Sequence, residues 1–362
     1  MNYSFSGQEK VFSPQLVYYK DIIEQNISRM AEIAGDPKRL WPHVKTHKMA
    51  EMVKLQLAKG IRHFKCATIA EAQMCAEAGA EALLLAYPLV GPNLGRFLTL
   101  CQRYPGTVCY AMSDNTEQAA LMGKAALEAG TELLLMMDVD IGQHRTGVPL
   151  DDVVGTYRSW AALPGVRMCG LHCYDGHRHE QNYAQRLALV EETDKQILAI
   201  KEALQCGLVI LGGTPSFPCH AALTEEALSP GTCVVQDADY QRMYPDMPFT
   251  PGAAVLTRVI SRPGRQEFTL DMGTKAVASD PAVKAVIAGM EYAETVLHNE
   301  EHWVVRVPEE HIADIPPIGA ILFAVPSHIC PTTALYPSVP VIENGGIIGE
   351  WTVTARNRCI GI

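Results

Sequence analysis

The stretch RHFKCATIAEAQMCAEAGAEALLLAYP, residues 62–88, shows the unit from which most of this chain is built. Two apolar runs, RHFKCA and ALLLAYP, flank a segment with helical periodicity that closes on a glycine, as helices often do. A strand, a helix and a second strand in this order predict two parallel strands joined by a helical crossover.

The same alternation continues from about residue 43 to residue 236. Its eight apolar runs are HVKTH, RHFKCA, ALLLAYP, TVCYAM, ELLLMMDVD, VRMCGLHCY, LVILGG and TCVVQD. Eight strand and helix alternations predict an α/β fold, a (β/α)8 TIM barrel. A doubly wound sheet is the alternative, but no GxGxxG pattern follows the first run.

The character of the sequence changes after about residue 250. The runs VLTRVIS, QEFTLDMG, HWVVRV, GAILFAVPSH and EWTVTARNR are rich in β-branched residues, and turn signals such as RPG and ENGG separate them. This pattern predicts a mostly antiparallel β-domain. We therefore expect a barrel over residues 16–248 and a β-domain over residues 249–362, with residues 1–15 packing with the β-domain.

Composition excludes several classes of protein. The 362 residues are 48% hydrophobic and 19% charged, with a net charge of -10, which indicates a globular protein and disfavours nucleic-acid binding. No apolar signal segment opens the chain, and the longest apolar run, near IGAILFAVP, is too short to span a membrane. The 11 cysteines form no CxxC pair, so we expect buried thiols and a cytoplasmic location.

Unusual polar residues follow several of the predicted strands. In a TIM barrel the functional groups lie at the C-terminal ends of the strands. The residues found there are Lys45 and Thr46 after the first run, Arg145 after the fifth, Tyr174, His177 and His179 after the sixth, GGTPS after the seventh, and Asp237 and Tyr240 after the eighth. Together they predict a site on one rim of the barrel.

The GGTPS loop is a candidate phosphate site. Gly212 and Gly213 accept unusual backbone angles, so the loop can turn N–H groups toward an anion and let a ligand approach closely. TIM barrels often bind phosphate after strands seven and eight. The alternative is a plain turn that leads into a helix capped by Thr214 or Ser216.

Lys45 is a candidate nucleophile. A lysine captures a carbonyl group when burial or nearby cations lower its pKa, and His43, His47 and Lys48 flank this one. Strand alternation would place His43, Lys45 and His47 on one side. A rim lysine beside a phosphate loop is the layout that pyridoxal phosphate requires, whereas a solvated KTHK loop is the alternative.

His328 and Cys330 are candidate metal ligands within AVPSHICPT. Residues i and i+2 of a strand share a face, and an imidazole with a thiolate suits zinc. Two protein ligands leave coordination positions for water or substrate. The alternative is a buried cysteine next to a surface histidine.

Several motifs together resemble one family. RLWPHVKTHKMAEM, FKCATIAEA, YPLVGPN, YDGHRH, GGTPS and VPSHICPT, with the ending W.V.AR.R, resemble the D-threonine aldolase and D-serine dehydratase family. Its members are fold-type III pyridoxal-phosphate enzymes with an alanine-racemase-like barrel and a β-domain. The resemblance extends from about Pro14 to Arg358, although Asn357 stands where glycine or aspartate is usual.

The resemblance implies a role for each candidate residue. Lys45 would form the Schiff base with pyridoxal phosphate, Arg145 would lie by the phenolate side, and Tyr174 would lie near the ring and the substrate. The phosphate would be held by Gly212, Gly213, Thr214, Gly231 and Tyr240. His328 and Cys330 would bind a divalent metal, with zinc as the first expectation and manganese or magnesium as alternatives. A homodimer is also implied.

The resemblance further implies a lyase that acts on β-hydroxy D-amino acids. Cys330 favours the D-serine dehydratase type, because dehydratases of the family carry His-x-Cys and well-known aldolases carry His-x-Asp. The alternative is D-threonine aldolase, in which His177 or His179 would take the β-hydroxyl proton. A racemase, a non-enzymatic pyridoxal-phosphate carrier and a class I aldolase are further alternatives.

Overall fold

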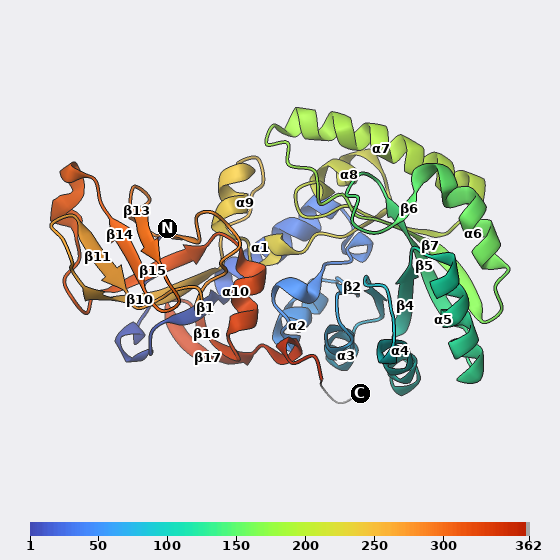
Figure 1. Cartoon of the computed structure of the whole chain (residues 1–362), viewed down its shortest axis with the longest axis horizontal. Coiled ribbons are helices and arrows are strands. Elements are labelled where there is room, and N and C mark those ends of the chain that lie inside the picture. Colours follow the sequence, from blue (N-terminus) through green and yellow to red (C-terminus); the bar gives the residue numbers. More distant parts are fainter. Residues whose placement is uncertain (360–362) are drawn as a thin grey trace. The chain divides into compact units, whose positions relative to one another are not determined.

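The structure is a computed structural model that describes residues 1–359, and its chain divides into two compact units (Figure 1). The β unit comprises residues 1–27, 46–48 and 232–353, and the barrel unit comprises residues 28–45, 49–231 and 354–359. Residues 16–27 and 232–248, which we expected in the barrel, thus belong to the β unit. The reason is strand pairing, because β1 (Gln15–Tyr19) lies between two strands of the β unit's sheet.

The barrel unit contains a curled sheet of eight strands, seven of them in one continuous parallel order. This order is β2 (His63–Cys66), β3 (Ala82–Leu85), β4 (Val108–Ser113), β5 (Leu133–Asp140), β7 (Val166–Cys173), β8 (Leu208–Leu211) and β9 (Ala227–Leu228), while β6 (Val148–Pro149) pairs with β5. Single bridges from Leu40 to Leu228 and from His43 to Lys65 join the two ends of the sheet. The expected TIM-like barrel is confirmed.

Helices alternate with the barrel strands, as the sequence periodicity predicts (Figure 1). They are α2 (Ala50–Ala58), α3 (Ile69–Ala78), α4 (Pro92–Arg103), α5 (Thr116–Glu128), α6 (Val153–Ala161), α7 (Tyr183–Leu204) and α8 (Phe217–Leu223). Helix α3 shows why the boundaries fall where they do. Thr68 caps its first turn by accepting the N–H of Glu71, and Gly79 ends it with a φ of 101°.

The barrel encloses an apolar cluster that holds the strands together. Its buried members are Trp41, Ala82, Leu84, Met112, Met136 and Ile210. Full burial of an aliphatic or aromatic side chain stabilises a fold by about 1.5–3 kcal/mol. Packing of this cluster therefore fixes the strands that carry the polar groups of the candidate site.

The β unit is built on a mostly antiparallel sheet, as predicted. Its main order is β13 (Glu294–His298), β14 (Trp303–Arg306), β11 (Glu267–Leu270), β10 (Ala253–Ser261), β1, β16 (Ser338–Glu343) and β17 (Gly346–Thr352). Strand β15 (Ile321–Pro326) pairs with β10 and with β12 (Ala285–Ile287). Among the named strands of the β unit that the structure describes, only β1 and β16 pair in parallel. The unit also contains α9 (Ala238–Met243) and α10 (Ile329–Leu335), and α1 (Lys20–Ala34) crosses the boundary between the units.

Two of the eight predicted barrel strands are wrong. HVKTH forms a single 3-10 turn over Val44–Thr46, and TCVVQD forms another over Thr232–Val234. In the second run the N–H groups of Val235 and Gln236 both donate to the carbonyl of Thr232. Hydrogen bonds within the turn therefore replace those that a strand would make to a neighbouring strand. The short strand β9 pairs with β8 instead.

The third correction concerns the metal motif. His328 is the N-cap of α10 and Cys330 lies in its first turn, so the two residues do not alternate along a strand.

None of the described helices is long and apolar enough to cross a membrane.

Candidate active site

Lys45 lies half-buried in its 3-10 turn, and its backbone N–H donates to His43 Nδ1 at 3.4 Å. The backbone close to Lys45 is hydrogen-bonded to the residue that precedes Gly231: the N–H of His43 donates to the carbonyl of Pro230 at 2.7 Å. A Cβ at Gly231 would lie 3.1 Å from the Cβ of His43, so this close approach favours glycine. The N–H of Gly231 in turn donates to Thr214 Oγ1 at 3.0 Å. The lysine segment and the GGTPS loop therefore meet at Gly231.

Gly212 and Gly213 allow close packing around the loop. A Cβ at Gly213 would lie 2.9 Å from Tyr174 Cε2, and one at Gly212, whose φ is +76°, would lie 2.7 Å from His220 Cδ2. Their N–H groups, which we expected to face an anion, are bonded inside the protein, to the carbonyl of Cys173 at 2.9 Å and to Ser216 Oγ at 3.0 Å. The two glycines thus shape the loop and admit Tyr174 beside it.

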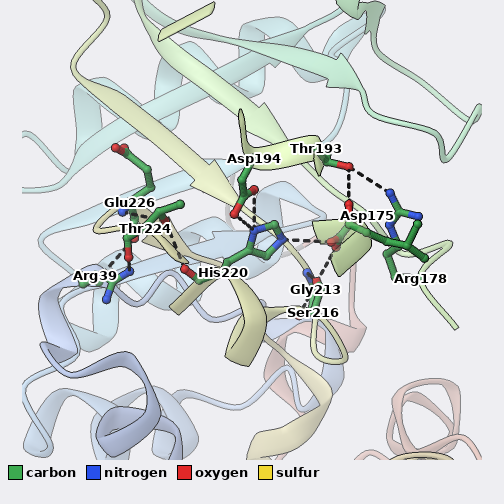
Figure 2. A network of polar contacts seen from close by, with 11 residues as sticks. Arg39, Asp175, Arg178, Thr193, Asp194, Gly213, Ser216, His220, Thr224 and Glu226 are labelled. Carbon is green, nitrogen blue, oxygen red and sulfur yellow. Dashed lines mark hydrogen bonds and ion pairs between the residues drawn. The ribbon is translucent and has the colours of Figure 1, made fainter. Parts of the chain in front are cut away.

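A buried network of hydrogen bonds supports the GGTPS loop (Figure 2). His220 lies between two carboxylates, with Nδ1 2.9 Å from Asp194 Oδ1 and Nε2 3.0 Å from Asp175 Oδ2. Ser216 Oγ donates to Asp175 Oδ1 at 2.6 Å and accepts the N–H of Gly213. Burial acts to lower the pKa of His220, but the hydrogen bonds to Asp175 and Asp194 outweigh it and raise that pKa to about 9. A buried imidazolium in α8 therefore bonds to the segment after β7 and to α7, and Ser216 bonds the same segment to the GGTPS loop.

The His220 network predicts a pH-dependent contribution to stability. Replacement of His220 with glutamine should destabilise the protein by about 3 kcal/mol near pH 6, because two buried carboxylates lose their counter-charge. The pKa of His220 is raised on folding, so its contribution is complete below about pH 6.5 and is lost as the pH rises through about 9. The difference in urea midpoint between wild type and variant should therefore narrow between pH 6 and pH 9.5.

A control for this prediction lies on the same helix. Val190 is buried in α7, as Asp194 is, but it carries no charge. Val190→Ala should lower the free energy of unfolding by an amount that does not change over this pH range. If the difference in urea midpoint between wild type and His220→Gln stays constant with pH, His220 is neutral in the folded protein.

A second buried network lies beside Tyr174. Lys65 Nζ is 3.4 Å from His172 Nε2, and His172 Nδ1 is 2.8 Å from Asp138 Oδ1. Thr146 donates to the other oxygen of Asp138 at 2.7 Å. Burial and the positive charge of Lys45 lower the pKa of Lys65 to about 7. A buried amine with such a pKa, near Lys45, marks this part of the barrel as chemically unusual.

Tyr174 lies within reach of two cations. Its ring centroid is 5.2 Å from Lys65 Nζ and 5.1 Å from Arg145 Cζ, distances that allow cation–π attraction. A Cβ at Gly176 would lie 2.2 Å from the Tyr174 hydroxyl, so glycine is required there as well. The structure thus places Arg145 beside the ring of Tyr174, and their cofactor roles stay predictions.

The two candidate bases differ in their surroundings. His177 is half-buried, and a Cβ at Gly142 would lie 2.8 Å from its Nε2, so its ring packs against the loop after β5. Its Nδ1 is buried and has no hydrogen-bond partner among the described residues. Burial and then the charge of Arg178 lower the pKa of His177. His179 is exposed. Of the two, His177 is the better placed to remain a neutral base.

The β unit holds the His328 and Cys330 pair. His328 Nδ1 is 2.5 Å from Asp280 Oδ2, and Cys330 Sγ is 3.2 Å from Thr46 Oγ1 and 3.6 Å from Thr232 Oγ1. Burial acts to lower the pKa of His328, but hydrogen bonds with Cys330 and Asp280 outweigh it and raise that pKa to about 9. The imidazole and the thiol are therefore in contact.

This pair has the chemistry of an open metal site. No cluster of three or more His, Cys, Asp and Glu side chains that could hold a metal ion occurs within residues 1–359. Asp280 binds Nδ1 of His328, which leaves Nε2 as the coordinating nitrogen, an arrangement common behind metal-bound histidines. Two hydroxyl groups lie within hydrogen-bonding distance of the sulfur. The donor set fits a metal held by two side chains with positions left for other ligands.

Tyr240, the remaining phosphate candidate, belongs to the β unit. Its N–H donates to Asp237 Oδ1 at 3.0 Å, and its ring contacts that of Tyr244 edge-on, with centroids 5.5 Å apart. Asp237 Oδ2 also accepts the N–H of Ile329, between the two metal candidates, at 3.2 Å. Burial raises the pKa of Asp237 to about 7. A phosphate role for Tyr240 stays a prediction.

Our sequence reasoning missed both buried networks. Lys65, His172 and Asp138 lie at buried positions of β2, β7 and β5, and an ionisable residue inside a buried strand is a signal that could have revealed them. His220 carries no comparable signal, because it lies in a short helix. Its two partners come from the segment after β7 and from α7, 45 and 26 residues away along the chain.

The fold and these residues define a fold-type III pyridoxal-phosphate enzyme. Residues 20–238 match the family described as alanine racemase, N-terminal domain, and residues 252–342 match that described as putative serine dehydratase domain. The chain belongs to the D-threonine aldolase and D-serine dehydratase family. Its relatives are pyridoxal-phosphate-dependent aldolases and dehydratases, which are lyases, and the chain is an enzyme of this class.

Three relatives illustrate the similarity. The chain is 31% identical to D-threonine aldolase of an Arthrobacter species, over 96% of this chain and 93% of the relative. It is 25% identical to D-threo-3-hydroxyaspartate dehydratase of a Delftia species, over 94% of this chain and 96% of the relative. The crystal structure of D-threonine aldolase from Filomicrobium marinum is 27% identical, with a TM-score of 0.88 over 98% of both chains.

Proposed function

We propose that this protein is a lyase for β-hydroxy D-amino acids that removes the β-hydroxyl group, with D-serine converted to pyruvate and ammonia. The observation that carries this proposal is the pair of contacts made by Cys330. Its thiol contacts His328 and also Thr46, the residue that directly follows Lys45 in the chain. The metal candidate therefore contacts a residue that is adjacent in the chain to the cofactor lysine.

The residues of the barrel unit fit pyridoxal phosphate. When bound, the cofactor draws electron density away from the substrate α-carbon. Lys45 would be the covalent attachment point, and its amine, when free, would take the α-proton of the substrate. The β-hydroxyl leaves with a proton as water, and the resulting enamine is hydrolysed to pyruvate and ammonia. Tyr174, with Arg145 and Lys65 near its ring, would line the cofactor, and the GGTPS loop with Gly231 would border its phosphate.

The His328 and Cys330 pair fits a divalent metal. Such a metal would act as a Lewis acid toward the β-oxygen of the substrate, and imidazole with thiolate favours zinc over manganese or magnesium. The solved variants of D-threo-3-hydroxyaspartate dehydratase lend support. They replace a histidine and a cysteine two positions apart, the spacing of His328 and Cys330, and the cysteine variant is in the metal-free form.

D-threonine aldolase activity is the second candidate. The 31% identity to the Arthrobacter aldolase over nearly the whole chain favours it. In that reaction the β-hydroxyl loses its proton and the bond between Cα and Cβ breaks, which gives glycine and an aldehyde. His177, with its lowered pKa and unpartnered buried Nδ1, is the base that we assign to this step. The homodimer and the cytoplasmic location stay predictions.

The products distinguish the two candidates. Purified enzyme loaded with pyridoxal phosphate and zinc is incubated with D-serine and, separately, with D-threonine. We expect pyruvate from D-serine and 2-oxobutyrate from D-threonine, each with one equivalent of ammonia. Formation of glycine and acetaldehyde from D-threonine would establish the aldolase instead. Conversion of the two substrates to their L-enantiomers alone would establish a racemase.

A further inference from the structure

Lys65 is a buried cation that has no carboxylate partner. Its side chain lies within the barrel unit and is 2% exposed. Its amine is hydrogen-bonded to His172 Nε2, and among the described residues it forms no ion pair with an aspartate or a glutamate. Lysine is almost never fully buried unless it is paired, because its charge then loses the hydration that water provides. Burial of this charge therefore destabilises the fold, which indicates a role in binding.

Two further cations of the barrel unit lie near Lys65. Lys65 Nζ and Arg145 Cζ are 5.2 Å and 5.1 Å from the centroid of the Tyr174 ring. The backbone of Lys65 lies beside the Lys45 segment, because its N–H donates to the carbonyl of Pro42 at 3.0 Å. Burial and then the charge of Lys45 lower the pKa of Lys65 to about 7. Within the described part of the chain, neither Lys45 nor Arg145 forms an ion pair.

The two carboxylates whose charges raise the pKa of Lys65, Asp138 and Asp175, are bonded to other groups. Asp138 accepts the Nδ1–H of His172 at 2.8 Å, and Asp175 Oδ2 is 3.0 Å from Nε2 of the His220 imidazolium. The cluster formed by Lys45, Lys65 and Arg145 therefore retains an excess of positive charge, which an anionic ligand would neutralise.

The hydrogen bond to His172 is compatible with both protonation states of Lys65. Burial and the charge of Lys65 lower the pKa of His172, so its imidazole is neutral and carries its N–H on Nδ1, toward Asp138. Nε2 therefore accepts a hydrogen from Lys65, over 3.4 Å. A neutral amine and an ammonium group both have a hydrogen to donate, so a proton can bind to Lys65 or leave it while the side chain stays in place.

An anion near this cluster would change the charge of Lys65. A phosphate monoester carries a charge of about -1.5 to -2 at pH 7, and a nearby anion favours the charged form of a lysine. We propose that Lys65 makes cofactor binding sensitive to pH: its amine takes up a proton from the solvent when the anionic cofactor enters the barrel, and the resulting charge stabilises the bound anion without contact. This inference rests on the proposed cofactor site at Lys45.

The sign of the pH effect follows from the two protonation states. Below about pH 7 Lys65 is charged before the ligand arrives, so binding is strongest there. As the pH rises, the proton must come from a lower concentration, and the affinity falls until the bound form loses the proton as well. Lys65→Met should therefore bind the cofactor about tenfold more weakly than wild type near pH 6.5, and equally well near pH 9.

The experiment measures binding of pyridoxine 5′-phosphate to the cofactor-free full chain by calorimetry. This probe carries the phosphate but no aldehyde, so it forms no bond with Lys45. Because the probe itself titrates, each variant is compared with wild type at the same pH. Measurements in two buffers with different ionisation enthalpies give the number of protons taken up, and near pH 7.5 wild type should take up more than Lys65→Met.

Lys124→Met is the matched control. Lys124 is exposed in α5 and lies 3.9 Å from Glu128, so this substitution removes the same charge from the surface of the barrel unit. It should leave both the pH profile and the proton uptake as in wild type. The Tm of cofactor-free Lys65→Met should equal or exceed that of wild type near pH 6, because an unpaired buried charge is lost.

The outcomes separate this inference from the proposed function. If wild type binds neither pyridoxine 5′-phosphate nor pyridoxal phosphate, the proposed cofactor site fails. If wild type binds the probe, but the ratio of its dissociation constant to that of Lys65→Met is the same at pH 6.5 and pH 9, the inference is overturned and the cofactor site stands. Equal proton uptake in the two proteins would also overturn it. A purely structural role would lower Tm and affinity at every pH and leave the ratio constant.

Discussion

Replacement of Lys45 with alanine is expected to abolish covalent capture of pyridoxal phosphate while the protein stays folded. Borohydride treatment of the wild type incubated with the cofactor should give one pyridoxyl group per chain, found by mass spectrometry on the peptide that contains Lys45. The variant should give none. Product formation from D-serine should fall by on the order of a thousandfold or more, since the same amine also takes the α-proton.

The physical reason lies in the position of Lys45. Its segment is hydrogen-bonded to Pro230, and Gly231, next to Pro230, bonds to Thr214 of the GGTPS loop, so the backbone of this lysine is fixed beside that loop. The side chain is half-buried, which leaves its amine within reach of a ligand. Far-ultraviolet circular dichroism and Tm close to wild type would show that the fold is retained.

Lys65 is the sharpest control for this prediction. Burial lowers its pKa to about 7, so on basicity alone it is the more readily deprotonated nucleophile. It is 2% exposed, however, and its amine is occupied by His172. Lys65→Met should therefore still be labelled on Lys45. A pyridoxyl group on Lys65, Lys48 or Lys275 in the Lys45→Ala protein would show that Lys45 is not the attachment point.

Replacement of Cys330 with alanine is expected to remove a bound metal without preventing cofactor capture. Metal content after incubation with zinc and desalting should fall from about one ion per chain to near zero, because a single imidazole does not hold the ion. Pyruvate formation from D-serine should fall by on the order of a hundredfold or more. The absorbance of the bound cofactor and the borohydride labelling at Lys45 should remain.

Hydrogen exchange at the α-carbon separates a catalytic metal from a structural one. Removal of the α-proton requires Lys45 but not a polarised β-oxygen, so Cys330→Ala should still incorporate deuterium from heavy water into D-serine. Wild type treated with a chelator should behave in the same way and recover with zinc. If exchange stops as completely as pyruvate formation, or if Tm and cofactor content fall with the metal, the metal supports the fold rather than the reaction.

Asp280 provides a matched variant for the metal site. It contacts His328 at 2.5 Å but does not contact the sulfur of Cys330 in any described interaction. Asp280→Asn keeps a hydrogen-bond acceptor for the imidazole and removes the charge. Zinc affinity should weaken by about tenfold to a hundredfold, a smaller loss than in Cys330→Ala, as expected for a residue that orients a ligand. Equal losses in the two variants would place Asp280 among the ligands.

The class of fold and the order of its parts follow from the sequence alone. Apolar runs that alternate with periodic segments, and the later change to β-branched runs, report which side chains are hidden from water, and this local pattern is enough to predict a parallel barrel and an antiparallel sheet. The motifs around Lys45, GGTPS and HIC likewise reveal the family, because they combine reactive residue types with turn residues over short distances.

Only the tertiary structure decided how the site is assembled. HVKTH and TCVVQD have strand-like composition, yet they form 3-10 turns, since local bonds to residues such as Thr232 satisfy their backbone. The partners of His220 and of Lys65 come from distant strands and helices, and no spacing along the chain encodes them. The sequence determines which residues are hidden from water, whereas three-dimensional packing determines which buried polar groups find partners.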